Sequence, residues 1–218
     1  MNVGSIATRY SRALFEEARA QSVDKYIYGY LGALYDNMSV VPEAQRALLN
    51  PRIKREYKFK LLYVASGLKT GDQMPKGFLD NLIALFKGEK NNLIPIDGEE
   101  KNKNTEEKAA ELYQKFLWLV LKHERISLMR LIILVYKELY REHHNIDHVM
   151  FASAMELDKS IEKKITKKIH EKTGREVELE MFVRPELIGG FWVVIGGKLY
   201  DYSYQTRLLN IRKSLWNK

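Results

Sequence analysis

The residues in this chain best suited to chemistry are three histidines, His143, His144 and His148, with Asp147 among them. If one helix ran through this stretch, His144 and His148 would lie four residues apart on the same side and could bind one metal ion. The apolar pattern changes from a helical to an alternating period near Asn145, so a helix is expected to end there. A polar helix terminus is the preferred interpretation. An enzyme built around this cluster is an alternative, which bound metal in the purified protein would reveal.

Other catalytic and cofactor motifs do not occur in the sequence. The phosphate-binding pattern G-x-x-x-x-G-K-[ST] is missing, and His123-Glu124 lacks the second histidine of a zincin motif. Because there is no cysteine, disulfides, thiolate metal sites and cysteine nucleophiles are excluded. We therefore predict a protein that is not an enzyme, with no catalytic residue, no cofactor and no metal site.

Two glycine pairs flank one apolar run, Phe191 to Ile195. Gly189-Gly190 and Gly196-Gly197 do not fit G-x-G-x-x-G, because that motif joins a strand to a helix. The first pair predicts a bend, and the second predicts a two-residue hairpin turn.

A lysine-rich segment between Asp158 and Thr173 raises the question of an acidic partner. Its lysines lie away from an apolar stripe, and they are Lys159, Lys163, Lys164, Lys167, Lys168 and Lys172. A solvated helix face is one interpretation, and a contact for an acidic protein or nucleic acid is the other. Gly174 stands alone where an RNA-clamping G-x-x-G loop would need two glycines. The net charge of +8 is spread along the chain, so no nucleic-acid partner is expected.

The first part of the chain is expected to be helical. Apolar residues recur there at spacings of three and four, and Ser5 is a candidate N-cap for the first helix. The apolar faces predict helices over residues 6–18, 26–35, 43–49, 52–65, 105–123 and 127–143. Residues 67–104 interrupt this order like an insertion, with an amphipathic segment at 78–86 and an exposed loop at 87–104.

From about Asn145 the period is two, which marks a domain boundary and predicts domains 1–144 and 145–218. Strands are predicted at 149–154, 177–183, 191–195 and 198–200. A helix should end at Gly174, and a last helix, capped by Asp201 or Ser203, carries Leu208, Leu209, Ile211 and Leu215. The fold class is therefore α+β, with an amino-terminal all-α helical bundle followed by a small α/β carboxy-terminal domain. No apolar run approaches the ~20 residues of a membrane span, and the opening residues predict no secretory signal.

Several motifs in this order resemble one family, the delta subunits of F-type ATP synthases and their mitochondrial counterpart, the oligomycin-sensitivity-conferring protein. They are the opening run Ile6 to Phe15, the Asn50-Pro51 step, the run from Phe116 to Arg125, and the entry to the second domain at Val149, Ser153-Ala154 and Leu157. The closing segment is the most specific part, with Leu187, Ile188, Gly189, Gly190, Phe191, Val193, Ile195, Gly196, Asp201, Ser203, Arg207 and Leu208. Tyr202 departs from the family, which usually has a small residue between the Asp and the Ser. The resemblance covers nearly the whole chain.

The resemblance implies a non-catalytic stator component of a proton- or sodium-translocating ATP synthase. In the family, the helical domain caps the catalytic alpha/beta head by binding the amino-terminal segment of an alpha subunit, in a groove involving the first and fifth helices. The second domain meets the b-subunit peripheral stalk. The resemblance also implies that each complex holds one copy of the chain, which is peripheral to the cytoplasmic face of a bacterial inner membrane. A basic RNA-associated adaptor is the alternative function, and a steep salt dependence of RNA binding would reveal it.

The first-helix face of Ala7, Tyr10, Ala13 and Leu14 suits such a groove, because small alanines let a partner helix approach closely. The same face could equally be bundle core, and the sequence leaves the two interpretations open.

Overall fold

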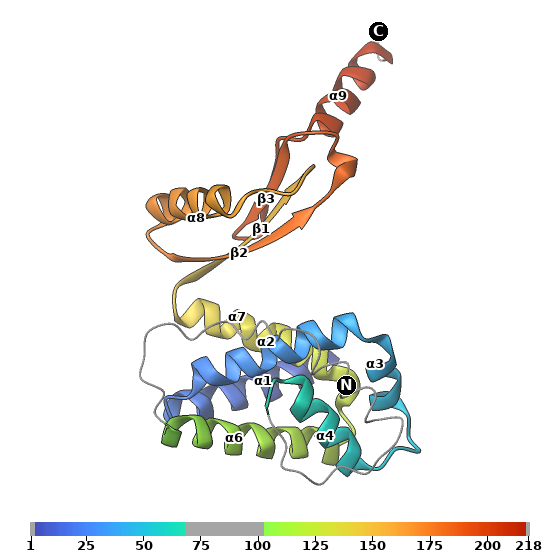
Figure 1. Cartoon of the computed structure of the whole chain (residues 1–218), viewed down its shortest axis with the longest axis vertical. Helices are drawn as coiled ribbons and strands as arrows, with labels where there is room; N and C mark the ends of the chain where they lie inside the picture. Colours follow the sequence, from blue (N-terminus) through green and yellow to red (C-terminus); the bar gives the residue numbers. More distant parts are fainter. Residues whose placement is uncertain (1–2, 69–102, 217–218) are drawn as a thin grey trace. The chain divides into compact units, whose positions relative to one another are not determined.

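The computed structural model describes residues 3–68 and 103–216. The chain divides into two compact units, Met1–Tyr140 and Arg141–Lys218. The first unit is helical, and the second combines a four-stranded sheet with helices (Figure 1). The predicted α+β class is confirmed. The predicted amphipathic segment at 78–86, and the predicted loop up to residue 102, lie outside the described residues.

The first unit consists of helices that follow one another with short connections. In chain order these are α1 (Val3–Ala20), α2 (Asp24–Val40), α3 (Pro42–Leu49), α4 (Arg55–Ala65), α6 (Lys103–Lys122), the short 3-10 helix η1 (Ile126–Leu128) and α7 (Met129–His143). Two predicted boundaries were wrong. Ser5 does not cap α1, because the helix begins two residues earlier. The helix expected from Arg52 begins at Arg55, because a turn follows Pro51.

The bundle is held together by buried apolar side chains and by hydroxyl groups that bond across helices. Ser11 is fully buried, and its hydroxyl lies 2.9 Å from the carbonyl oxygen of Ala7 and 2.8 Å from that of Ile132, which ties α1 to α7. Tyr136 donates to the carbonyl oxygen of Asp24 at 3.2 Å. Since a buried hydroxyl without a partner is costly, these bonds fix how the helices pack.

Several helices of the bundle end in the left-handed conformation without a glycine. Glu124 has φ +57°, and the N–H groups of Glu124 and Arg125 donate to the carbonyl oxygens of Leu121 and Val120. This pattern closes the end of α6, and Ser22 closes α1 in the same way. Arg125, one of the family-motif residues, therefore acts here through its backbone in a helix terminus.

The second unit is built on a sheet with strand order β2-β1-β3-β4. Its elements are β1 (Ile146–Ser153), α8 (Lys159–Thr173), β2 (Glu176–Val183), the 3-10 helix η2 (Pro185–Leu187), β3 (Phe191–Ile195), β4 (Lys198–Asp201) and α9 (Tyr204–Trp216). β1 and β2 are parallel and are joined through α8, whereas β3 runs antiparallel to both β1 and β4.

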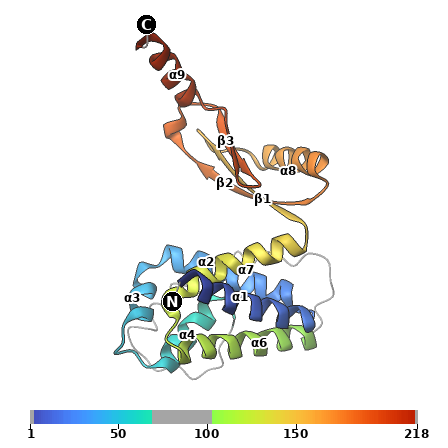
Figure 2. The ribbon, with the colours of Figure 1, turned by 180° about the vertical axis from the view of Figure 1, so that it is seen from behind.

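α8 covers one face of this sheet, as both views of the ribbon show (Figures 1 and 2). The core beneath it is centred on Val149, Phe151 and Val193. The apolar stripe of α8 packs there through Ile165 and Ile169, and the lysines lie away from it on the outer side, as predicted. Gly174 ends α8 with φ +68°, which confirms the predicted C-cap.

The hairpin between β3 and β4 also follows the prediction. Gly196 and Gly197 have φ +56° and +75°, the sign that a two-residue turn between twisted strands requires at both positions. The turn pairs Ile195 with Lys198.

Two buried tyrosines of the bundle give a stability test. Tyr113 shares a 2.6 Å hydrogen bond with Ser66, whereas the Tyr30 hydroxyl is buried with no partner among the described residues, and burial raises the pKa of both phenols. Tyr113→Phe should lower the free energy of unfolding by about 1 kcal/mol. Tyr30→Phe should leave it unchanged or raise it, because no bond is lost. Urea unfolding measures both, and an equal loss in the two variants would contradict the hydrogen-bond assignment.

Candidate protein-binding surfaces

The face of α1 that the sequence singled out is divided by the bundle. Ala7 and Leu14 are buried in the core, Tyr10 is half-buried, and Ala13 is exposed. Because successive helical residues are about 100° apart, Ala7 and Ala13 lie about 120° from each other around the helix axis. One side of the predicted face therefore packs inward. The core interpretation applies to Ala7 and Leu14, and only Tyr10 and Ala13 could touch a partner.

α1 and α6 run in opposite directions next to this face (Figure 1). A groove lies between them. One hollow of the groove is lined from both helices, by Glu17, Gln21, Lys108, Glu111, Leu112 and Lys115. Tyr10 is seven residues from Glu17 and so lies on the same side of α1. α6 is the fifth α-helix in chain order in the part of the chain that the structure describes.

α6 also exposes large apolar side chains that the bundle does not cover. Trp118 and Leu119 are 43% and 46% exposed, and Leu119 continues the line of Leu112 two turns further along the helix. Trp118 stacks on Phe59 of α4 with ring centroids 5.0 Å apart, which fixes the indole at the surface. The sequence period of this helix alone does not distinguish a core stripe from a second, exposed one.

The carboxy-terminal motif residues build the junction between the sheet and α9. A Cβ on Gly189 would lie 2.6 Å from the Tyr204 ring, and one on Gly190 would collide with the backbone carbonyl oxygen of Tyr202. Tyr204 donates its N–H to the carbonyl oxygen of Gly189 at 2.9 Å. The glycine pair thus makes room for the first turn of α9. Tyr202 fits at this junction because it is exposed and packs against Phe191.

Asp201 and Ser203 form the cap of α9. The N–H of Ser203 and the hydroxyl of Thr206 each donate to the Asp201 carboxylate at 2.8 Å, and the N–H of Thr206 donates to the Ser203 hydroxyl at 3.3 Å. Hydrogen bonds from Ser203, and then from Thr206, hold the pKa of Asp201 below its usual value. The cap therefore stabilises the fold above the pKa of unfolded aspartate, near 4, and is lost only as pH falls through the lower folded value.

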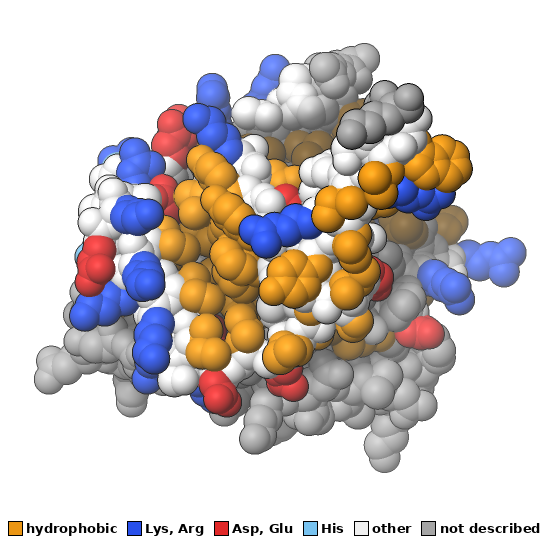
Figure 3. Space-filling view, turned by 90° about the horizontal axis from the view of Figure 1, so that it is seen from above, with side chains coloured by type: hydrophobic (Ala, Val, Ile, Leu, Met, Phe, Trp, Pro, Cys, Tyr) orange, Lys and Arg blue, Asp and Glu red, His pale blue; other side chains and the backbone are white. Residues whose placement is uncertain are grey.

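Beyond this cap, α9 carries its apolar side chains in solvent. None of its residues is buried, and the exposed set is Tyr204, Leu208, Leu209, Ile211, Leu215 and Trp216. Figure 3 shows apolar side chains gathered on one face of the molecule, with Lys and Arg side chains beside them. Arg207 is also exposed on α9. The sequence predicted this helix and its apolar residues, but not that its own domain leaves them uncovered.

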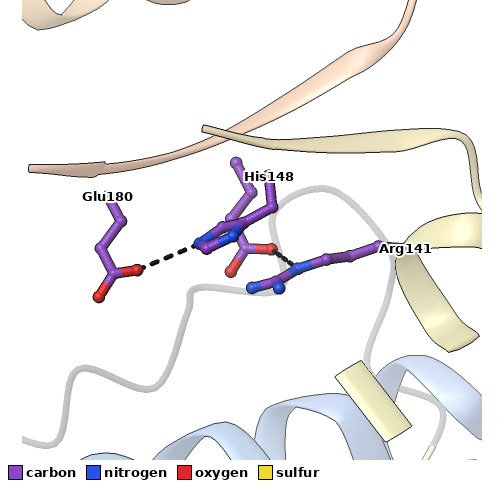
Figure 4. Close-up of polar contacts among 4 residues, drawn as sticks. Arg141, His148 and Glu180 are labelled. Atoms are coloured by element: carbon purple, nitrogen blue, oxygen red, sulfur yellow. Dashed lines mark hydrogen bonds and ion pairs between the residues drawn. The ribbon is translucent and has the colours of Figure 1, made fainter. Parts of the chain in front are cut away.

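The histidine cluster is separated by the end of α7. The helix ends at His143, and His148 lies on β1, where its Nε2 is 3.1 Å from a carboxylate oxygen of Glu180 on β2 (Figure 4). Arg141 pairs with Glu178 of the same strand at 2.7 Å. The interpretation of a polar helix terminus is therefore supported by this geometry. Within residues 3–68 and 103–216, no group of His, Asp or Glu side chains could hold a metal ion.

Comparison with known proteins decides the family. The family model described as ATP synthase delta (OSCP) subunit matches residues 99–215. The chain belongs to this family. An ATP synthase subunit delta of Parabacteroides distasonis is 31% identical over 99% of this chain and 98% of that protein. Relatives of the same name in Phocaeicola vulgatus and Fusobacterium nucleatum are each 26% identical and cover 98% and 96% of the chain.

A solved structure extends the likeness to the fold. A chain in the mitochondrial ATP synthase hexamer of Toxoplasma gondii matches with a TM-score of 0.61, covering 96% of this chain and 97% of that chain at 14% identity. Delta (OSCP) proteins are structural subunits of ATP synthase and are not catalytic, so the predicted family and non-enzymatic role are confirmed. The comparisons give no support to an RNA-associated adaptor. No helix in the described ranges is long and apolar enough to span a bilayer.

The glycine pair at the α9 junction gives a second stability test. Gly174 and Gly190 have similar positive φ values, +68° and +75°, but a Cβ on Gly174 meets no atom within 4 Å. Gly174→Ala should cost about 1 kcal/mol of backbone strain, and Gly190→Ala should cost about 3 kcal/mol, because a clash adds to the same strain. Urea unfolding followed by fluorescence compares the two. Equal losses would show that the approach of Tyr202 to Gly190 is not tight.

Proposed function

We propose that this chain is a stator component of a proton- or sodium-translocating F-type ATP synthase. It links the alpha/beta catalytic head to the b-subunit peripheral stalk, so that the head does not rotate with the central shaft. The observation that carries this proposal is that each of the two units keeps large apolar side chains in solvent, Trp118 and Leu119 in one and those of α9 in the other. A linker needs two separate binding surfaces, and exposed apolar area of this kind is typical of protein interfaces.

The α1–α6 groove is the proposed site for the amino-terminal segment of an alpha subunit. Leu112 lines the hollow itself, and Tyr10 and Leu119 lie on the same sides of α1 and α6 beyond it. Exposed Ala13 lines a second hollow formed by α1 residues, where it would leave space for a helix backbone to come close. Charges of both signs, including the paired Glu111 and Lys115 at 2.7 Å, form its border. An amphipathic helix laid in a groove uses this combination of apolar centre and polar rim. Ala7 and Leu14 support the groove from within the core.

The second unit is the proposed partner of the b-subunit stalk, and α9 is the contact surface that we assign to it. The proposed assembly holds one copy of the chain, peripheral to the membrane on the cytoplasmic face of a bacterial inner membrane. No nucleic acid, cofactor or metal takes part.

The head-binding surface is tested with Ala13→Trp. The indole would occupy the space into which the partner helix must fit, so binding of an alpha-subunit amino-terminal peptide should weaken by tenfold or more, equivalent to about 1.4 kcal/mol. Val40→Trp is the matched control, because Val40 is exposed at the end of α2, outside the groove. Isothermal titration calorimetry measures both, and circular dichroism verifies folding. Unchanged binding by a folded Ala13→Trp variant would refute the groove assignment.

The linking role itself is tested by using the chain as bait with detergent-solubilised membranes of its own organism. Recovery of alpha, beta and b subunits together is expected. Recovery of none of them would overturn the proposed function, whatever the result with the peptide.

A further inference from the structure

α8 covers one face of the sheet in the second unit and leaves the other face open. The core side chains of the sheet, among them Val149, Phe151 and Val193, point to α8. Because side chains alternate along a strand, their neighbours form an open face that consists of Met150, Ala152, Phe182, Trp192, Val194 and Leu199. Among the described residues of the second unit, no helix lies against this open face in either ribbon view (Figures 1 and 2).

The open face is apolar, and its aromatic side chains are held in place by packing. Phe182 and Trp192 come from β2 and β3, which β1 separates, but their ring centroids are 6.3 Å apart. The two rings therefore meet over Ala152, which lies between them in the register and is fully buried. Leu199, in the neighbouring row, is 62% exposed. A sheet face of this kind normally packs against a helix or a second sheet.

Acidic side chains line the open face along β2. Glu176, Glu178 and Glu180 alternate with the core residues of that strand, so they point to the open face. Arg141 pairs with Glu178, and His148 lies beside Glu180, whose side chain is still 52% exposed (Figure 4). With three carboxylates and one arginine, this border is acidic. A helix that covers the open face should therefore carry basic residues.

α9 has the complementary composition. Tyr204, Leu208, Ile211 and Leu215 are separated by four, three and four residues, so they lie along one side of the helix. They are between 53% and 69% exposed. The charged residues of α9 are all basic, and they are Arg207, Arg212 and Lys213. The second unit therefore exposes two apolar surfaces, the open face and α9, whose charges are opposite in sign.

The connection from β4 keeps α9 away from the open face of its own copy. Only Tyr202 and Ser203 lie between the two elements. The Asp201–Ser203 cap and the bond from Tyr204 to Gly189 fix the start of the helix. A turn of α9 back onto its own sheet would break these bonds, whereas an α9 from a second copy can cover the open face with all of them kept.

The area involved favours a reciprocal contact. A large apolar side chain has about 150–200 Å² of surface, so the four exposed residues on the apolar side of α9 offer on the order of 400 Å². The open face would lose a similar area beneath them. One such contact buries roughly 800 Å², which is no more than a non-specific contact, whereas two bury roughly 1,600 Å², which is typical of stable complexes. A twofold exchange of α9 therefore reaches the size that a dimer needs.

We propose that two copies of this chain, when they are not part of the ATP synthase, form a dimer by exchanging α9. Each α9 packs on the open face of the second copy. Its apolar side covers Phe182, Trp192 and Leu199, and its basic residues meet the glutamates of β2. The contact is the same in both directions, as a twofold dimer requires. The exchange itself does not depend on the proposed function.

Sedimentation equilibrium of the full chain tests the dimer, and a monomer at every concentration up to about 100 µM would overturn the proposal. Ile211→Asp on α9 and Leu199→Lys on the open face should each raise the dissociation constant of the dimer by about tenfold or more, because both contacts contain the changed residue. Circular dichroism verifies that the variants fold.

Two matched controls lie next to these positions. Asn210 lies off the apolar side of α9, and Tyr200 points to the opposite face of the sheet from Leu199. Asn210→Asp and Tyr200→Lys should leave the dissociation constant unchanged. Equal losses in variants and controls would overturn the assignment of the two surfaces, because the added charge alone would then explain them.

A mixture of Ile211→Asp and Leu199→Lys distinguishes the exchange from pairing of α9 with α9. In the mixed dimer, the unchanged α9 of one variant meets the unchanged open face of the other. The mixture should therefore form a dimer more tightly than either variant alone. If Leu199→Lys dimerises like the original chain and mixing restores nothing, α9 pairs with α9 and the proposal is overturned.

The exchange would protect the chain before assembly, because exposed apolar area otherwise favours aggregation. This role rests on the proposed function, which assigns α9 to the stalk. The soluble carboxy-terminal part of the b subunit should therefore dissociate the dimer in the same sedimentation experiment. If a confirmed dimer stays intact, the role before assembly is wrong and the exchange stands. If the b segment binds neither the original chain nor the variants, the linking role itself fails.

The same b segment tests a different occupant of the open face. Loss of its binding in Leu199→Lys but not in Ile211→Asp, with no dimer formed by the original chain, would assign the open face to the stalk and overturn the proposal. Binding to the monomeric Leu199→Lys variant is expected, because α9 is unchanged there.

Discussion

The second unit must hold α9, a short helix that packs against the unit only at its first turn and that the unit does not bury. α9 leaves the sheet through a junction where Gly189 and Gly190 admit the first turn. Ser203 accepts the N–H of Thr206 there, and Asp201 accepts the N–H of Ser203 and the hydroxyl of Thr206. Everything beyond this turn extends into solvent with its apolar side chains exposed. The most specific motif of the sequence therefore positions and caps the start of α9. A Cβ on Gly190 would collide with the backbone of Tyr202, and one on Gly189 would collide with the ring of Tyr204, so both positions favour glycine.

The two surfaces differ in the way that two different partners would require. The groove of the first unit has borders of mixed charge, with Lys108 and Lys115 opposite Glu17 and beside Glu111. α9, in contrast, carries Arg207, Arg212 and Lys213 and no acidic residue. Hydrophobic burial would give each contact its affinity, and the charge pattern would prevent the partner of one surface from settling on the other.

Much of the fold could be predicted from the sequence, because burial imposes a period on each element. The stripe of α8, the glycines of the β3–β4 hairpin and the cap at Gly174 follow from local rules. The helix ends at Ser22 and Glu124 could not be predicted from the sequence. Both residues adopt a left-handed backbone conformation that the sequence marks reliably only when the residue is glycine. The candidate site was predicted less well. The period of α1 groups Ala7 with Ala13, but the neighbouring helices decide which of them is buried. In α9 the sequence predicts a helix with apolar residues. It does not show whether this chain or another protein covers them.

Because the chain has two attachment surfaces, each surface can bind its partner with lower affinity than a single surface would need. In a stator under load, a partner bound at one surface holds the second partner close to its own, so rebinding is fast and the combined lifetime exceeds that of either contact. Moderate interfaces then suffice, such as a shallow groove and one exposed helix. Attachment and transmission of force remain distinct, because loss of one surface leaves the chain bound through the other but no longer connects head and stalk. The proposed role therefore depends on both surfaces being present in the same chain, and the affinity of either one alone does not measure it.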